Sequence, residues 1–342
     1  MKEECILAIE SSCDETAIAI LKNGNELLCN TVNTQIKDHQ KFGGVYPELA
    51  SRLHLKNITG ILSYALSLKG FDIHSITHVA VTGGPGLPGA LQIGARAAKT
   101  IATYLNVPIL SVHHLAGHIY ANEYAADFHY PLLALIASGG NSQIVLIKSP
   151  LNFEIIGETE DDAIGEAFDK VARELGLPYP GGVYIDKVSR DPSIETFKLP
   201  KPKVEGYNLS YSGLKSHLVR RIEKEPRNPD GTLPEEVIKR YARSTEVGFI
   251  NQLLDKVLKA ALDYKVKEVV VGGGVSANSY LRSEVASRFQ DTGIEVVVPP
   301  LWCTTDNAAR IAKVARHRIE RGLTTDRTFT TEPNRRLENE GK

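Results

Sequence analysis

The sequence has 342 residues, of which 42% are hydrophobic and 24% charged, and its formal net charge is -1. This composition fits a globular chain of about two domains and excludes a disordered chain, collagen and a coiled coil. The near-zero charge argues against a surface that binds nucleic acid all over, but it allows one local basic face. Its 4 cysteines form no CxxC pair, and a secreted disulfide scaffold of this length is normally richer in cysteine, so we expect a cytoplasmic protein. No apolar stretch reaches the ~20 residues of a membrane helix.

Apolar runs and turn residues predict an alternation of strands and helices that occurs twice. The first set has strands at 5–11, 16–21 and 26–32, a helix at 47–68, a strand at 78–82, a helix at 90–105 and a strand at 108–112. The second set has strands at 132–137, 142–147 and 153–157, helices at 163–176, 212–224 and 234–264, a strand at 268–271, a helix at 277–289, a strand at 294–298 and a helix at 305–321. This weak duplication predicts two similar α/β lobes that face each other across a cleft. We expect the first lobe at 1–130 plus 303–326, the second at 131–302, and a loose polar tail at 327–342.

Polar turns in the two halves are candidate phosphate sites. Asp14 and Glu15 follow the first strand, and adjacent carboxylates can hold Mg²⁺, although a solvated hairpin tip is the alternative. In the second half the turn is Ser138-Gly139-Gly140-Asn141, whose glycines permit positive φ and a close approach of phosphate, with an ordinary hairpin turn as the alternative. The loop Gly272-Gly273-Gly274 leads into a helix whose first turn holds Asn278, which could contact a ribose or an adenine.

A histidine pair is the candidate metal site. His114 and His118 are four residues apart at the start of an expected helix, so both imidazoles share one face. Two imidazoles suit iron, zinc or a similar metal, and Asp306, at the start of the last helix, is the expected third ligand. A zinc protease would need HExxH, but Leu115 stands in place of that glutamate, so peptidase chemistry is not supported. His113 is expected to have a structural role.

Charged residues are unevenly distributed in the second half. The acidic residues of 158–169 are typical of a solvated helix start, and the loop Tyr179-Pro180-Gly181-Gly182 ends that helix and could contact a ribose or a base. Basic residues interleaved with tyrosines could form a local RNA-facing surface, with ordinary solvated helix faces as the alternative. These basic residues are Lys198, Lys201, Lys203, Lys215, Arg220, Arg221, Lys224, Arg227, Lys239, Arg240 and Arg243.

Taken together, these blocks resemble the bacterial-type tRNA N6-adenosine threonylcarbamoyltransferase family, formerly described as O-sialoglycoprotein endopeptidases. The matching blocks are residues 11–16, 44–52, 99–119, 138–141, 165–171, 179–182, 210–215, 272–278 and 305–309. The resemblance spans about Ile6 to Lys313, nearly the whole chain. The chain departs from the family pattern at Ala116, at Asn141 and in the spacing between Cys303 and Asp306.

The resemblance implies a fold and a reaction. The fold is a two-lobed actin/Hsp70/sugar-kinase-like α/β fold with duplicated lobes. The reaction is transfer of the threonylcarbamoyl group from threonylcarbamoyl-AMP to N6 of the adenosine 3′ of the anticodon, in tRNAs that read codons beginning with A. A sugar or small-molecule kinase of the same fold is the alternative, which the histidine pair disfavours. A non-catalytic, nucleotide-gated regulator is a further alternative.

The resemblance also implies site residues and partners. His114, His118 and Asp306 would hold one divalent metal, Fe(II) ahead of Zn or Mn, and Mg²⁺ would accompany the nucleotide. Asp14 and Glu15 would act near the phosphate and the metal. Besides tRNA, the expected partners are a TsaB-like paralogue and a TsaE-like ATPase, or a second copy of the chain. The residues expected to bind the adenylate are Ala137, Ser138, Gly139, Gly140, Asn141, Asp169, Gly182, Asp186 and Asn278.

Overall fold

The computed structural model describes residues 3–341. Contacts divide the chain into two units. The first runs to Ala125 and also contains Ser149–Phe153 and the chain from Thr305 onward, and the second comprises Ala126–Lys148 and Glu154–Thr304. The expected lobe boundaries lie close to these, but the short return of Ser149–Phe153 to the first unit was not predicted. Within residues 3–341 no helix is long and apolar enough to cross a membrane.

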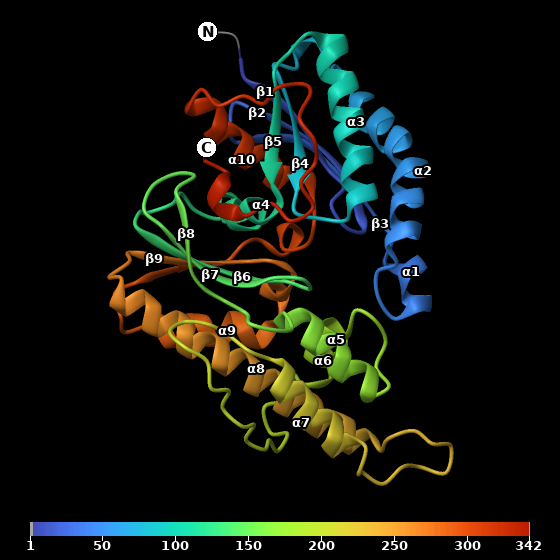
Figure 1. Cartoon of the computed structure of the whole chain (residues 1–342), viewed down its shortest axis with the longest axis vertical. Helices are drawn as coiled ribbons and strands as arrows, with labels where there is room; N and C mark the ends of the chain where they lie inside the picture. Colours follow the sequence, from blue (N-terminus) through green and yellow to red (C-terminus); the bar gives the residue numbers. More distant parts are fainter. Residues whose placement is uncertain (1–2, 342) are drawn as a thin grey trace. The chain divides into compact units, whose positions relative to one another are not determined.

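The first unit is built on a five-stranded sheet in the order β3-β2-β1-β4-β5 (Figure 1). β1 pairs antiparallel with β2 and parallel with β4. Helices α2 and α3 pack together on one face of this sheet, and α10 packs on the other. The elements of this unit are β1 (Cys5–Glu10), β2 (Glu15–Lys22), β3 (Glu26–Thr34), α1 (Ile36–His39), α2 (Pro47–Leu66), β4 (His78–Gly84), α3 (Pro88–Leu105), β5 (Ile109–His113), α4 (His114–Tyr120) and α10 (Ala308–Glu320).

The second unit has its own five-stranded sheet, in the order β10-β9-β6-β7-β8. β6 pairs antiparallel with β7 and parallel with β9, and α5, α7, α8 and α9 bury their apolar residues against this sheet in one core. The elements of this unit are β6 (Leu132–Ala137), β7 (Ser142–Ile147), β8 (Phe153–Glu158), α5 (Ile164–Glu174), α6 (Gly181–Val188), α7 (Ser212–Ile222), α8 (Glu235–Asp263), β9 (Glu268–Gly272), α9 (Ser279–Phe289) and β10 (Glu295–Val297).

The two sheets have the same topology. In each, the first strand lies at the centre. The second strand, antiparallel to the first, and then the third strand extend one side, and two strands parallel to the first extend the other. Each turn between the first two strands therefore lies at the carboxyl end of its central strand. The predicted duplication of two α/β units is confirmed.

Three local predictions are corrected by the structure. The Tyr179–Gly182 segment is not only a loop, because α6 begins at Gly181. The last helix begins at Ala308, so Asp306 precedes it, and Asn307 is its N-cap. Asn278 is likewise the N-cap of α9 rather than a residue of its first turn.

The C-terminal segment was expected to be loose, and this expectation is wrong. Glu340 is fully buried in the first unit, where its carboxylate accepts hydrogen bonds from Arg335 (2.7 Å) and from the backbone N–H of His113 (3.1 Å). Its backbone carbonyl accepts a hydrogen bond from Arg318 (2.7 Å). A segment of polar composition is thus fixed by buried charge pairing.

Candidate functional site

The histidine pair is positioned by an abrupt change from strand to helix. β5 ends at His113, whose Nδ1 accepts a hydrogen bond from the backbone N–H of Leu115 (3.1 Å) and so caps α4. His113 is therefore structural, as expected. His114 and His118 lie one turn apart on α4. Their rings pack edge to face, with the ring centroids 4.9 Å apart.

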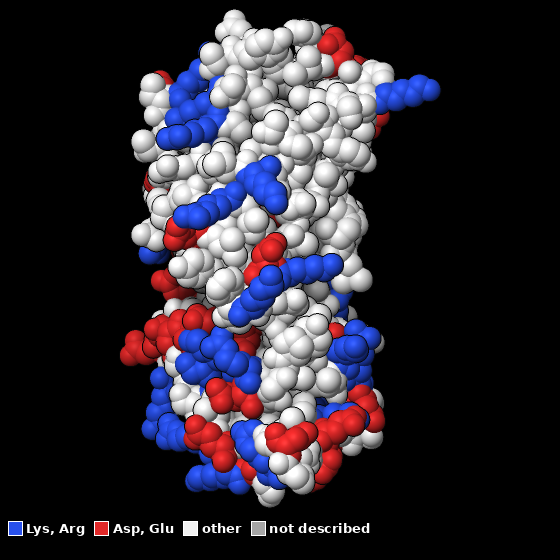
Figure 2. All heavy atoms as spheres, turned by 90° about the vertical axis from the view of Figure 1, so that its right-hand side faces the viewer, with Lys and Arg blue, Asp and Glu red and all other residues white. Residues whose placement is uncertain are grey.

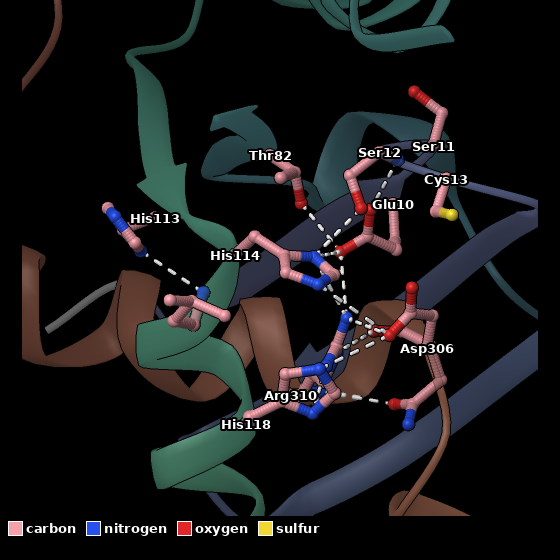
Figure 3. A network of polar contacts seen from close by, with 12 residues as sticks. Glu10, Ser11, Ser12, Cys13, Thr82, His113, His114, His118, Asp306 and Arg310 are labelled. Atoms are coloured by element: carbon pink, nitrogen blue, oxygen red, sulfur yellow. Dashed lines mark hydrogen bonds and ion pairs between the residues drawn. The ribbon is translucent and has the colours of Figure 1, made fainter. Parts of the chain in front are cut away.

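Asp306 reaches the histidines because α4 and α10 pack closely. A Cβ on Gly117 would lie 2.9 Å from the end of the Ile311 side chain and 3.2 Å from the Arg310 side chain, so the two helices are in close contact at this glycine. Asp306 Oδ1 lies 3.4 Å from His118 Nε2 and 3.8 Å from His114 Nε2 (Figure 3). The candidate ligand atoms of the three residues all lie within 4.8 Å of one another. Donors that share one ion at about 2.1 Å lie roughly 3.0–3.4 Å apart, so this donor set fits a single metal ion after a small closure.

Two buried charged residues, Glu10 and Arg310, complete this cluster. Glu10 ends β1, and its Oε2 lies 3.2 Å from His114 Nδ1, 3.2 Å from the Arg310 guanidinium and 2.9 Å from the Thr82 hydroxyl that donates to it. Burial opposes ionisation of Glu10, but His114 and Arg310 lower its pKa to about 2. Sequence reasoning did not assign either residue to the site. The signal for Glu10 was a single acid at the end of an apolar strand.

Arg310 also contacts the candidate ligands. Its guanidinium lies 2.8 Å from Asp306 Oδ1 and 3.1 Å from His114 Nδ1, and it hydrogen-bonds to His118 Nδ1. A guanidinium only donates, so His118 Nδ1 is the acceptor and the ring proton is on Nε2. Burial, followed by Arg310, lowers the pKa of His118 to about 3, so the ring is neutral at pH 7. Metal binding through Nε2 would move that proton to Nδ1, which requires Arg310 to turn away.

The first polar turn lies within the electrostatic field of this cluster. Burial raises the pKa of Glu15 well above its usual range, and the carboxylates of Asp14 and Asp306 raise it further. Glu15 Oε1 accepts a hydrogen bond from the Thr34 hydroxyl (3.1 Å). The charge of Asp306, a candidate metal ligand, thus acts on Glu15 in this turn.

In the second polar turn, Ser138 and Asn141 are hydrogen-bonded to each other, and the two glycines between them are exposed. The Ser138 N–H donates to the Asn141 carbonyl (2.8 Å), and the Asn141 N–H donates to the Ser138 hydroxyl (3.1 Å). Gly139 and Gly140 are exposed between them, and a Cβ on either would have no neighbour within 4 Å. Neither has the positive φ that we expected glycine to provide. These glycines leave open space beside the backbone, where a ligand can approach.

Two other glycines bring the backbones around this turn into contact. Gly273 has a φ of 94°, and a Cβ on it would lie 2.3 Å from the Ala137 carbonyl oxygen. The Gly165 N–H donates to the Ser138 carbonyl (3.2 Å), and a Cβ on Gly165 would lie 2.6 Å from that oxygen. The turn, the start of α5 and the glycine-rich loop after β9 therefore form one compact group.

Two predicted carboxylates bind the starts of neighbouring helices. Asp169 accepts a hydrogen bond from the Gly181 N–H (2.7 Å). Burial raises the pKa of Asp169 to about 6, although the backbone N–H groups of Gly181 and Gly182 oppose this shift. Asp186 accepts a hydrogen bond from the N–H of Ser279 (2.8 Å), next to the predicted Asn278. Asp169 and Asp186 therefore each fix the start of one helix in the second unit.

Sequence reasoning missed Glu246 of α8, which contacts one of these residues. Asn278 Oδ1 accepts the Leu281 N–H (2.8 Å), while Asn278 Nδ2 donates to Glu246 Oε1 (2.8 Å). Glu246 is buried, and burial raises its pKa to about 7. Its spacing from Ala242 and Ile250 places it on the apolar face of the helix, and this was the available signal.

Comparisons with known proteins identify the family. The family model of TsaD, tRNA N6-adenosine threonylcarbamoyltransferase, matches residues 26–313. The chain is 43% identical over 341 residues to the tRNA N6-adenosine threonylcarbamoyltransferase of Halalkalibacterium halodurans, covering 99% of this chain and 98% of that one. It is 45% identical over 325 residues to the enzyme of the same name from Bacillus subtilis, covering 94% and 92%. The chain belongs to this family.

Solved structures support the fold. HypF from T. kodakarensis superimposes with a TM-score of 0.62 at 13% identity, covering 94% of this chain and 48% of that one. Component A of the (R)-2-hydroxyglutaryl-CoA dehydratase of Acidaminococcus fermentans superimposes with a TM-score of 0.52 at 15% identity, covering 92% and 98%. At these identities the likeness concerns the fold alone, and the actin/Hsp70/sugar-kinase-like class is confirmed.

Family membership establishes the reaction class. The protein is an enzyme that transfers a threonylcarbamoyl group to N6 of an adenosine in tRNA. Nothing in the comparisons favours the alternative of a sugar kinase. A possible metal site of two histidines and one aspartate is present in the first unit.

The basic residues expected to face RNA are partly neutralised. Lys215 pairs with Asp162 (2.6 Å), and Arg240 pairs with Glu225 (3.0 Å). Figure 2 shows Lys and Arg interspersed with Asp and Glu over the lower part of the visible face. The basic excess therefore forms no continuous patch on this face, and binding of tRNA there stays a prediction.

Proposed function

We propose that His114, His118 and Asp306 form the catalytic metal centre of the transferase reaction. The proposal rests on one observation: Nε2 of His114 and Nε2 of His118 lie 3.8 Å and 3.4 Å from Oδ1 of Asp306, which precedes α10, and one candidate ligand atom from each residue lies within 4.8 Å of the others. Two histidines and one carboxylate suit Fe(II), with Zn and Mn as alternatives. Such an ion, when bound, supplies a Lewis acid for a carbonyl oxygen.

The chain's own residues orient the ligands. Ser12 Oγ and Glu10 Oε2 lie 2.8 Å and 3.2 Å from His114 Nδ1, so they fix the ring with Nε2 toward Asp306. Hydrogen-bonded second partners of this kind hold a ligating imidazole in one orientation. We propose that Asp14 and Glu15 act beside this centre, where they would bind Mg²⁺ that accompanies the phosphate.

We propose threonylcarbamoyl-AMP as the donor and the adenosine 3′ of the anticodon, in tRNAs that read codons beginning with A, as the acceptor. The exocyclic amine of adenine is a weak nucleophile because its lone pair is delocalised into the ring. An activated acyl donor, held in a fixed orientation, compensates for this weakness. The open space beside the backbone of Gly139 and Gly140 supports a phosphate contact. The other proposed adenylate-binding residues are Ala137, Ser138, Asn141, Asp169, Gly182, Asp186 and Asn278.

We propose that the enzyme works in the cytoplasm on tRNA with a TsaB-like paralogue and a TsaE-like ATPase, or with a second copy of itself. This proposal rests on the chain's membership of the threonylcarbamoyltransferase family.

A nucleoside assay tests the proposed metal centre. Unmodified tRNA is incubated with threonylcarbamoyl-AMP and the enzyme, with and without the partner proteins, and the tRNA nucleosides are measured by mass spectrometry. We expect His114→Ala to lower the yield of threonylcarbamoyladenosine at least about 100-fold, whereas the exposed control His74→Ala retains wild-type yield. Wild-type yield from His114→Ala would overturn the metal assignment and leave the family activity standing.

A further inference from the structure

A second cluster of metal-ligating groups lies in the second unit, formed by His129, Glu268 and Glu295. Glu268 and Glu295 are the first residues of β9 and β10, which are neighbouring parallel strands, and they stand opposite each other in the register. His129 precedes β6, which is the other neighbour of β9. Three adjacent strands thus bring one imidazole and two carboxylates together at the amino end of the sheet.

The His129 imidazole lies between two glutamates that would repel each other without a positive partner. Like charges directly opposite on neighbouring strands destabilise a sheet. Glu268 is fully buried, and its Oε2 accepts the His129 backbone N–H (3.0 Å). Its Oε1 is also buried and has no hydrogen-bond partner in the part of the chain that the structure describes. A buried carboxylate oxygen without a partner is costly, so Glu268 retains the capacity to bind one further donor or cation through Oε1.

The distances suit a small divalent ion. His129 Nδ1 lies 3.2 Å from Glu268 Oε2 and 3.2 Å from Glu295 Oε2. Nitrogen and oxygen ligands bound tetrahedrally to Zn²⁺ at 2.0–2.1 Å lie about 3.3 Å apart. The candidate ligand atoms of all three residues lie within 4.8 Å of one another. His129 and Glu295 have side chains 60% and 54% exposed, so an ion can enter from solvent and keep a water ligand.

We propose that His129, Glu268 and Glu295 form a second, structural metal site that takes a divalent cation of the zinc type. The ion would join the segment before β6 to β9 and β10 and replace the proton that the imidazole shares with the two carboxylates. Because the three ligands come together only in the folded chain, binding would stabilise the second unit. This site is independent of the proposed catalytic centre, which lies in the first unit.

The test counts Zn²⁺ bound per chain. Chelator-treated full-length protein is dialysed against Zn²⁺, and bound metal is measured in wild type, Glu268→Gln and His129→Ala. We expect each variant to bind one equivalent less than wild type, with affinity at this site weakened at least about 100-fold. His129 is exposed, so His129→Ala reports on the site even where Glu268→Gln disturbs folding. The control is Glu320→Gln. Glu320 also pairs with a histidine, since it lies 3.5 Å from His317 Nδ1, but the second carboxylate at that histidine, Glu123, contacts the other ring nitrogen, Nε2. The two carboxylates therefore do not meet at one nitrogen, as they do at His129.

The difference of one equivalent does not depend on whether the His114 site takes zinc, so the two proposals can fail separately. Added Zn²⁺ should also raise the unfolding temperature of wild type more than that of His129→Ala. Equal zinc content in wild type and His129→Ala would overturn the second site and show an ordinary histidine–glutamate ion pair. Equal loss in Glu320→Gln would show nonspecific surface binding and would also overturn it.

Discussion

Arg310 and Glu10 place opposite buried charges against the candidate metal ligands. Breaking a buried pair by removing one partner is strongly unfavourable, whereas the pair itself contributes little net stability. The spacing of His114 and His118 predicted their shared face, because i and i+4 residues share a face on any helix. The burial of Glu10 and Arg310 could not be predicted, since it depends on how α10 packs against β1.

Arg310→Met is expected to tighten metal binding at the His114 site by about tenfold. The change removes a fixed cation near the ligands and frees His118 Nδ1 to carry the proton, while a side chain of similar length still fills the space. Isothermal titration with Fe(II) or Zn²⁺ under anaerobic conditions measures the effect. Arg316→Met, on the same helix but paired with Glu320 near the surface, should leave affinity unchanged. Unaltered or weaker binding by Arg310→Met would contradict this view of Arg310.

Glu246 is expected to make the enzyme less stable as the pH rises. Its pKa is raised from 4.5 to about 7 in the folded chain, mainly by burial. Between these two pKa values, Glu246 has released its proton in the unfolded chain but retains it in the folded chain. The contribution of Glu246 to the free energy of unfolding therefore falls with increasing pH. Glu246→Gln should reduce this fall between about pH 5 and about pH 8, measured by urea unfolding. The exposed Glu236→Gln should keep the wild-type slope, and an equal slope in Glu246→Gln would be the contrary result.

At the scale of elements, apolar runs bounded by polar turns were sufficient to predict β6 and β7 to the residue. β6 is buried on both faces and therefore appears as a short, uninterrupted apolar segment, whereas β7 has its apolar run after Ser142 and Gln143. Helix α6 was missed because Tyr179-Pro180-Gly181-Gly182 is typical of a turn. Its first N–H is bound by Asp169 from another helix, and this contact is not visible in the local sequence.

The loop after β9 offers a matched pair of glycines for a test. Gly273→Ala should destabilise the protein by at least about 2 kcal/mol, because positive φ and the Ala137 carbonyl both exclude a side chain. The neighbouring Gly274 has no atom within 4 Å of a built Cβ, so Gly274→Ala should change stability by less than about 0.5 kcal/mol. Urea unfolding measures both values. Similar costs for the two variants would contradict the proposed close approach of the backbones.

At the scale of the whole molecule, the duplication was predictable because each half repeats the same order of strands. The fixed C-terminal segment was not, since its polar composition is that of an exposed tail. Its order comes from Glu340, which neutralises arginines contributed by α10 and by the segment itself. Pairing of this kind depends on tertiary contacts and leaves no periodic pattern in the sequence.

Glu340→Ala is expected to destabilise the first unit by about 3–5 kcal/mol, because it leaves buried arginines without their carboxylate. The nearby Glu338 pairs with Arg336 at the surface, so Glu338→Ala should cost less than about 1 kcal/mol. Thermal and urea unfolding of the full chain measure the difference. A loss for Glu340→Ala no larger than for Glu338→Ala would show that the segment contributes little to the fold.

The central claim is that threonylcarbamoyl transfer requires a metal held by His114, His118 and Asp306. The most direct measurement is the yield of threonylcarbamoyladenosine in tRNA after chelation and stepwise return of Fe(II), with threonylcarbamoyl-AMP supplied. We predict that chelation abolishes product formation, that returned Fe(II) restores it in wild type, and that Asp306→Asn is not restored. Undiminished product from the metal-free wild-type enzyme, or full restoration of Asp306→Asn, would contradict the claim.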